Sequence, residues 1–169
     1  MNRSRFLAPF LLAVAMLAGC RDANDVAVGR QERATQARAG VQTVSATRTA
    51  LACEILRLVS AEGGCTVDPR TGQSVGPLNA YAVSRVGYER RFAGPPTLGE
   101  IEEYLQGHEA MIAEDAKVFI GAWRDHSTNE CYLDLTELIA DRGLAEAYAR
   151  RRQQRCIYHL ATDTEIRLR

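Results

Sequence analysis

The order of apolar and polar residues predicts a domain in which helices and strands alternate. Between Val44 and Ser60 most apolar residues are three, four or seven positions apart, which is the spacing of an amphipathic helix. A second helix is predicted over 98–112, because Thr97 and Glu100 form a capping-box pattern ahead of another apolar stripe. A third helix is predicted over 139–153.

Strands are predicted where residues of high β-propensity form short runs between turn residues. These runs are Asn79–Val86, Lys117–Trp123, Glu130–Thr136 and Arg155–Ala161, with Glu165–Leu168 as a further short edge. From residue 79 the order is strand, helix, strand, strand, helix, strand, which matches the split βαβ, ferredoxin-like pattern. The expected fold class is therefore α+β. It has a small, mainly antiparallel sheet of about four strands with helices packed on it, preceded by an N-terminal helix.

The first twenty residues have the layout of an export signal. Arg3 and Arg5 precede an apolar run over 6–17, which is too short for a membrane-spanning helix, and the run ends in Leu17-Ala18-Gly19-Cys20. This segment resembles a bacterial lipoprotein signal, and the resemblance implies removal of residues 1–19 and attachment of lipid to Cys20. The next residue is not Asp, which favours the outer over the inner membrane. An ordinary signal peptide cut elsewhere and an uncleaved anchor remain alternatives.

Composition divides the chain into three parts: a signal peptide over 1–19, a lipidated tether over 20–42 and one α+β domain over 43–169. The tether is polar and alanine-rich, and a flexible coil of that length spans roughly 25 Å. The precursor carries 21 basic and 21 acidic residues. A near-neutral, mixed charge gives no electrostatic case for binding nucleic acid.

The remaining cysteines are an even number in a chain that is expected to be exported, which predicts two disulfides. They are Cys53, Cys65, Cys131 and Cys156. The favoured pairing is Cys53–Cys65 with Cys131–Cys156; the other two connectivities and four free thiols stay open. In the split βαβ order one strand would separate Cys131 from Cys156, roughly 9.6 Å, beyond the distance of about 7 Å that a disulfide spans. A Cys131–Cys156 disulfide and the split βαβ strand order therefore exclude each other.

Catalytic candidates are few. Gly72-Gln73-Ser74-Val75-Gly76 fits the G-x-S-x-G pattern of a nucleophile elbow, for which Asp125, His126 and His159 would complete a triad. A solvent-exposed turn in which glycine is needed for backbone reasons is the alternative, because no strand–Ser–helix order surrounds Ser74. No metal site and no cofactor are predicted, since the cysteines and histidines lack ligand spacing.

Other conspicuous residues have structural explanations. His108 lies on the apolar stripe of the second helix, where a satisfied, half-buried histidine is expected. Glu100, Glu102 and Glu103 are assigned to a cap and a solvated face. The basic run Arg150–Arg155 suits a helix end, and contact with anionic head groups or an acidic partner is the alternative. Phe119, Trp123 and Tyr132 are assigned to core or edge packing on the hairpin, and a ligand platform is the alternative.

The stretch from 63 to 166 resembles small uncharacterised bacterial and phage-associated domains. The matching segments are Gly64-x-Thr66, Arg70-Thr71-Gly72, Tyr81-Ala82-Val83-Ser84, Gly121-Ala122-Trp123, Tyr132-Leu133-Asp134-Leu135 and Ile157-Tyr158. The resemblance implies one compact domain and brings no activity with it.

The sequence thus predicts a lipid-anchored periplasmic protein of the bacterial envelope, with a non-enzymatic role in interaction or protection. Its expected partners are membrane lipid through Cys20 and an envelope protein. One alternative is a small hydrolase using Ser74. The other is a small-ligand binding module with an apolar cavity between the helices and the sheet.

Overall fold

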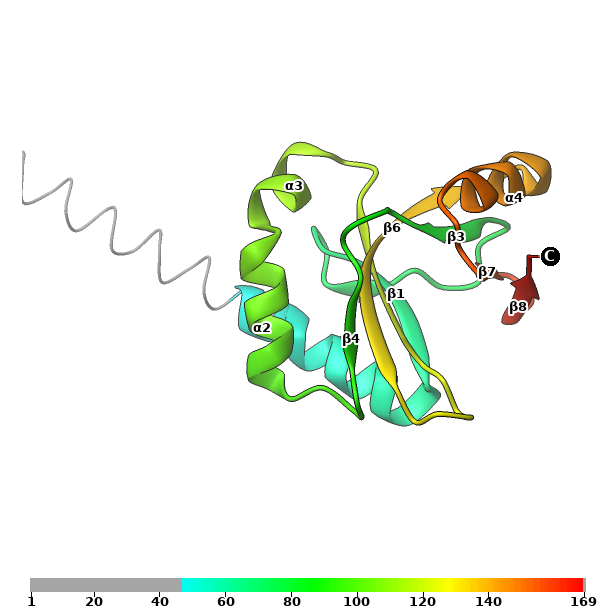
Figure 1. Ribbon diagram of the computed structural model, residues 1–169. Coiled ribbons are helices and arrows are strands. Elements are labelled where there is room, and N and C mark those ends of the chain that lie inside the picture. Colours follow the sequence, from blue (N-terminus) through cyan, green and yellow to red (C-terminus); the bar gives the residue numbers. More distant parts are fainter. Residues whose placement is uncertain (1–46, 169) are drawn as a thin grey trace, which may run out of the picture. The chain divides into compact units, whose positions relative to one another are not determined.

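The computed structural model describes residues 47–168, which form one antiparallel sheet of eight strands with four helices (Figure 1). The strands are β1 (Gly64–Asp68), β2 (Gln73–Ser74), β3 (Tyr81–Ser84), β4 (Arg90–Phe92), β5 (Phe119–Arg124), β6 (Cys131–Ile139), β7 (Cys156–His159) and β8 (Thr164–Arg167). The helices are an N-terminal helix (residues 47–62), α2 (Leu98–Gly107), α3 (Glu109–Glu114) and α4 (Arg142–Arg151). The tether and the signal segment, including Cys20, lie outside the described residues.

The predicted four-stranded sheet is wrong. The strand order is β2-β1-β5-β6-β3-β7-β8, with β4 also paired to β6, and the sheet curls into a half-barrel. In its middle β3 lies between β6 and β7, but β1, β2 and β4 lengthen and curl the sheet beyond the expected arrangement. These three strands are short or polar, so their sequences carry little of the alternation by which a strand is recognised.

The curl originates where β3 and β4 share one edge of β6. Ser84 is paired with Thr136, and Arg90 with Leu133. Six steps along the β3–β4 segment therefore face three steps along β6, a large bulge that contains Gly87 at φ +84° and in which Arg85 N donates to Leu135 O at 2.8 Å. Extra residues in one strand bend a sheet and increase its local twist.

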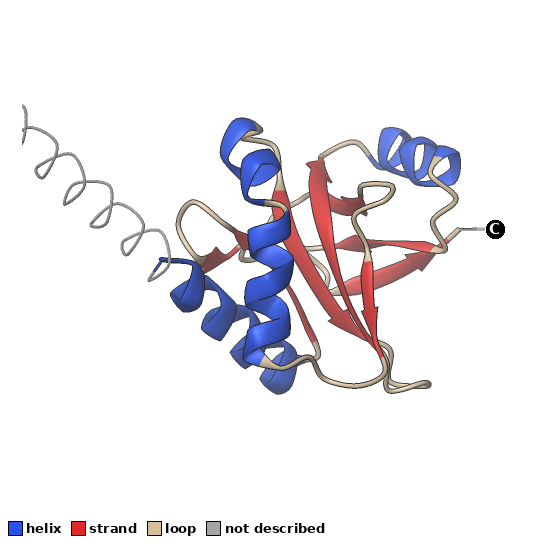
Figure 2. Cartoon of the chain, turned by 60° about the vertical axis from the view of Figure 1, so that its left-hand side comes forward, coloured by secondary structure: helices blue, strands red, loops and turns tan. Residues whose placement is uncertain are grey.

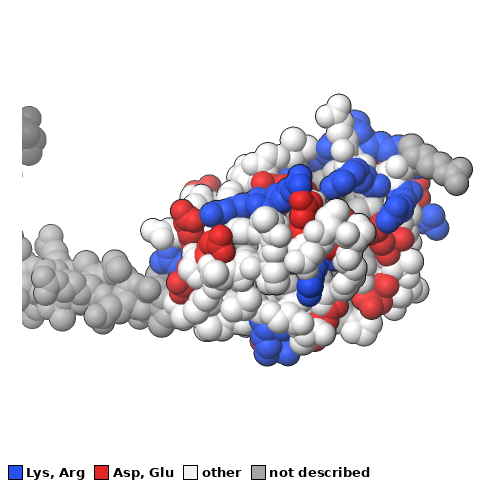
Figure 3. All heavy atoms as spheres, turned by 60° about the horizontal axis from the view of Figure 1, so that its bottom comes forward, with Lys and Arg blue, Asp and Glu red and all other residues white. Residues whose placement is uncertain are grey.

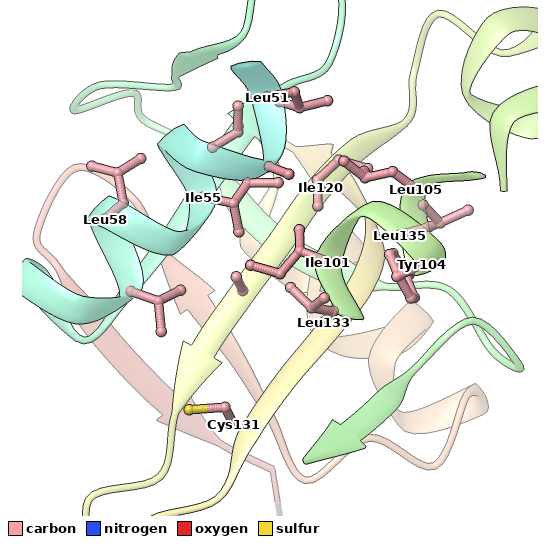
Figure 4. Close-up of a cluster of buried hydrophobic side chains, with 14 of the residues drawn as sticks. Leu51, Ile55, Leu58, Ile101, Tyr104, Leu105, Ile120, Cys131, Leu133 and Leu135 are labelled. Atoms are coloured by element: carbon pink, nitrogen blue, oxygen red, sulfur yellow. The ribbon is translucent and has the colours of Figure 1, made fainter. Parts of the chain in front are cut away.

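The N-terminal helix and α2 pack against one face of the sheet, which we call the convex face (Figure 2). Figure 4 shows the core between them, where Ile55 of the N-terminal helix lies toward Ile101 of α2. Leu51 and Leu58 of the same helix and Leu133 of β6 belong to the same buried cluster. The spacing of four and three residues along the N-terminal helix is the predicted apolar stripe. Gly63, at φ +81°, ends the helix and begins the turn into β1.

A smaller core lies at the other end of the convex face. Ala145 and Ala149 of α4 are buried against Val83 of β3 and Ile157 of β7. In the register of the strands, Val83 and Ile157 share the convex face with Leu133 and the main core. Every helix in residues 47–168 that has a buried stripe therefore covers the same side of the sheet.

The predicted capping box is confirmed, but the predicted helix over 98–112 is broken. Thr97 Oγ1 accepts from Glu100 N, and Thr97 N donates to Glu100 Oε2 at 2.7 Å. At His108 the backbone N–H donates to Leu105 O, while the ring Nδ1 donates to Tyr104 O at 2.8 Å. The side chain thus occupies the carbonyl that the backbone would use in a continuous helix, and α3 starts as a separate turn.

Candidate functional site

Strand β6 is buried on both faces, although helices cover only one of them. Its side chains alternate between the two faces, and six consecutive ones are buried. Those on the convex face are Cys131, Leu133 and Leu135, and those on the opposite face are Tyr132, Asp134 and Thr136. The second set faces the inside of the half-barrel, opposite Trp123, Gly121 and Phe119 of β5. Polar side chains on an inner, helix-free face are the first indication of a site.

A cavity of about 800 Å³ lies on this inner face. We call it the concave groove. It is bounded by β1 and β5 on one side, by β7 and β8 on the other and by residues 74–77 before β3, with Asp134 of β6 between them. The volume is within the range of small-molecule sites in proteins. The small-ligand hypothesis had placed an apolar cavity between helices and sheet, whereas this cavity is on the opposite face and mixes polar with apolar residues.

Asp134 is the chemically unusual residue of the groove, because it is only 3 % exposed. Ser84 Oγ donates to its Oδ2 at 2.8 Å, and Thr136 Oγ1 donates to its Oδ1. Burial raises the pKa of Asp134, and the two hydroxyl hydrogen bonds act in the opposite direction. Among residues 47–168 no Lys, Arg or His forms an ion pair with it.

Gly121 leaves the room that Asp134 occupies. A methyl group built on Gly121 would lie 2.5 Å from Asp134 Oδ1 and closer still to Thr136 Oγ1. Glycine is therefore required here by close approach across the β5–β6 ladder, where Gly121 and Asp134 are paired.

Ser84 is held from outside the groove by the segment that follows α4. Its backbone N–H donates to Gln154 Oε1 at 3.1 Å, and its carbonyl accepts from Gln154 Nε2 at 2.5 Å and Arg152 Nη1 at 3.2 Å. Arg152 also pairs with Glu137 at 3.3 Å. These contacts fix the end of β3 and thereby the hydroxyl that donates to Asp134.

An aromatic pair lies beside Asp134. The rings of Trp123 and Tyr132 are stacked with centroids 4.3 Å apart and planes 8° from parallel. Tyr132 Oη donates to Glu130 Oε2 at 2.8 Å. Trp123 lines the groove and is the only tryptophan in the chain.

The predicted triad is not assembled. Ser74 is exposed on the two-residue edge strand β2, and its hydroxyl has no hydrogen bond to a histidine among residues 47–168. Asp125 accepts from the backbone and hydroxyl of Ser127, at 2.8 and 2.6 Å. His159 contacts Thr162 and Asn79, and stacks on Tyr81 with a centroid distance of 4.5 Å. His126 is exposed and lies against Gly63.

The four described cysteines are free in the structure: Cys53 is exposed, Cys65 and Cys156 are half-buried, and Cys131 is buried. The favoured Cys131–Cys156 bond does not fit the sheet, because β3 lies between β6 and β7. Two strand spacings, roughly 9.6 Å, exceed what a disulfide spans. Burial raises the pKa of Cys65 to about 12 and that of Cys156 to about 11, so both thiols stay protonated at neutral pH. Disulfide formation through the other pairings of these residues stays a prediction.

Other predicted residues have ordinary roles. His108 is half-buried between Tyr88 and Tyr104. Within the basic run, Arg150 pairs with Glu146 at 3.0 Å, and Arg151 lies over the ring of Tyr148 at 5.1 Å. Basic and acidic side chains are interspersed on the face shown in Figure 3, as the composition implies.

Sequence reasoning missed Asp134, Ser84 and Gly121. One signal was available: in Cys131-Tyr-Leu-Asp-Leu-Thr136 an acidic residue and a threonine alternate with apolar residues inside a strongly hydrophobic strand.

Within residues 47–168 there is no group of three or more His, Cys, Asp or Glu arranged to hold a metal ion. Over the same residues no helix has the length and apolar character needed to cross a bilayer.

No protein-family model, curated protein or solved structure matches this chain. The concave groove is therefore the feature from which a function can be inferred.

We expect Gly121→Ala to lower the free energy of unfolding by about 1–3 kcal/mol, because the added methyl overlaps Asp134 and Thr136. Urea denaturation measures the change. The matched control is Gly107→Ala at the end of α2, where a methyl group meets nothing within 4 Å. That variant is expected to be unchanged or slightly more stable. Equal stability of the two variants would contradict the proposed packing.

We expect Asp134→Asn to be more stable than the wild type at neutral pH. The folded state holds the Asp134 proton more tightly than the unfolded chain, so the wild type loses stability as pH rises from the unfolded pKa, about 3.9, to the raised folded pKa. The amide has no proton to release. Urea denaturation between pH 4 and 8 should therefore show a stability advantage that grows as the pH rises toward the folded pKa, and an advantage independent of pH would contradict the burial of the charge.

Proposed function

We propose that this protein is a lipid-anchored protein of the bacterial cell envelope whose domain binds a small molecule in the concave groove. The observation that carries the binding role is the buried Asp134, which lines a cavity of about 800 Å³ without a cationic partner among residues 47–168. The anchoring role is inferred from the N-terminal sequence pattern.

The composition of the inner face favours binding over packing. A carboxylate buried in a sheet costs stability, and an apolar residue of similar volume at this position would ordinarily be neutral or stabilising. Here the chain adds Gly121 to make room for the carboxylate and uses Ser84 and Thr136 to orient it. Retention of a destabilising group beside a cavity is typical of a functional site.

The geometry supports a binding role better than hydrolysis. Nucleophilic catalysis needs a base within hydrogen-bond reach of the nucleophile. Ser74 has no such base among the described residues, and Ser84 donates to a carboxylate that is itself buried. A non-enzymatic interaction role agrees with this arrangement.

The anchor would place this domain at a membrane surface. The apolar run over 6–17 and the sequence Leu17-Ala18-Gly19-Cys20 favour cleavage before Cys20 and acylation of that residue. Multiple acyl chains hold a protein stably, whereas a single chain gives only reversible attachment. Arg21 favours the outer membrane, with the domain facing the periplasm.

We expect the native protein to begin at Cys20 and to carry fatty acyl groups. Intact-mass measurement of protein extracted from membranes in detergent tests this directly. Cys20→Ser should leave an unprocessed, unacylated precursor, because the acceptor sulfur is lost. Ser4→Ala in the same leader is the control and should be processed normally. A native chain that retains residues 1–19, or that lacks acyl mass, would contradict the proposed anchor.

We expect native protein from its source cells to retain a small molecule that Ala82→Phe excludes. Ala82 faces the groove from β3 and is half-buried, so a phenyl ring there occupies the cavity without replacing a ligand-facing polar group. Native mass spectrometry followed by denaturing release measures the bound compound. Ala113→Phe, at an exposed position of α3, is the matched control and should retain it.

The melting temperature of both variants is measured alongside, so that loss of ligand can be separated from loss of fold. Equal retention by a folded Ala82→Phe variant would contradict binding in the groove.

A further inference from the structure

The lining of the concave groove is predominantly acidic. Its carboxylates are Glu62, Asp134, Asp163 and Glu165, and its only Lys or Arg among the described residues is Arg124. The Arg124 guanidinium is already engaged, because Nε donates to Asn129 Oδ1 at 2.9 Å and Nη2 donates to the same oxygen. The electrostatic field inside the groove therefore favours a positively charged occupant.

Asp134 is the carboxylate of this lining that is withdrawn from water without a counter-charge, whereas Glu62, Asp163 and Glu165 are exposed. Glu165 pairs with Arg167 at 2.8 Å, and Asp163 accepts from the hydroxyl of Tyr158 at the rim. Asp134 receives only the two neutral hydroxyls of Ser84 and Thr136, although a carboxylate offers about four acceptor positions. A buried carboxyl group is either protonated or paired, and a cation that enters the groove would supply the partner of its ionised form.

A metal ion is a poor candidate for that partner. Divalent cations bound by protein oxygens take several ligands, typically six to eight for calcium. Within residues 47–168 Asp134 is not part of any group of three or more potential ligands. The neighbouring hydroxyls of Ser84 and Thr136 donate to this carboxylate, so both act as hydrogen-bond donors to Asp134 and not as ligands beside it.

The rest of the groove suits the body of an organic molecule. Trp123, stacked on Tyr132, lines one side, and Pro77 and Leu160 contribute apolar surface elsewhere. Indole rings attract cations at their faces and bury a large apolar area. The cavity of about 800 Å³ is much larger than a single ammonium group.

We propose that the ligand of the concave groove is a small organic cation, in which a primary ammonium or guanidinium group pairs with Asp134 and an apolar body lies against Trp123. This inference rests on the proposed binding function of the groove and specifies its ligand class. It assigns Asp134 as the residue that selects charge and Ser84 and Thr136 as the groups that orient the carboxylate.

The test uses the full chain in detergent and the fluorescence of Trp123, which is the only tryptophan and therefore reports from the groove alone. Three probes share a phenylethyl or benzyl body and differ in charge: 2-phenylethylammonium, the neutral 2-phenylethanol and the anionic phenylacetate. Titrations are run at constant ionic strength, so that general screening does not differ between probes.

We expect a saturable fluorescence change with 2-phenylethylammonium and at least tenfold weaker binding of the other two probes. Asp134→Asn, which removes the charge and keeps the shape, should weaken binding of the cation at least tenfold and leave that of the alcohol unchanged. The matched control is Glu114→Gln at an exposed position of α3, which should bind the cation like the wild type.

Three results would overturn the inference, and they are distinguishable. Saturable binding of the alcohol or of phenylacetate with affinity equal to that of the cation would keep the groove as a binding site and refute the charge assignment. Absence of saturable change with all three probes would count against both the ligand class and the proposed function. Unchanged cation affinity in a folded Asp134→Asn variant would show that Asp134 does not select the charge.

Discussion

The structure depends on a central strand, β6, that is buried on both of its faces. On one face Leu133 and Leu135 enter the core beneath the N-terminal helix and α2. On the other face Asp134 and Thr136 lie inside the curl of the sheet. Burial of both faces is possible because β6 has β5 along one edge and both β3 and β4 along the other. The bulge between β3 and β4 bends the sheet over the inner face, so a surface without helices is still withdrawn from water.

This arrangement separates stability from chemistry. The convex face contributes the large apolar burial that offsets the conformational entropy of folding. The inner face carries a carboxylate, two hydroxyls and a glycine, a set that contributes little favourable burial and includes a costly group. A half-barrel with helices on one side can maintain such a set because the opposite face already supplies a continuous core.

The end of β3 connects the groove to the rest of the domain. Ser84 donates to Asp134 through its side chain and is bound to Gln154 and Arg152 through its backbone. Arg152 pairs with Glu137, and Arg85 Nε lies 2.7 Å from the same carboxylate and pairs with Asp115 through Nη2 at 2.6 Å. A chain of hydrogen bonds and ion pairs thus runs from the inner face to the segment after α3. Such a network holds the carboxylate in one orientation, which is what selective binding of a charged group requires.

Local features were determined by the sequence itself. The apolar spacing at 51, 55 and 58 and the pair Thr97 and Glu100 act within a few residues, so the N-terminal helix and the start of α2 follow from them. The proposed lipid anchor at Cys20 likewise rests on a contiguous pattern. The size of the sheet and the groove were decided by tertiary structure. Ser84 and Asp134 are 50 positions apart, and Gly121 reaches the carboxylate only through the β5–β6 register. Strand pairing between distant segments is set by global packing, and no local periodicity encodes which polar residues it will bring together.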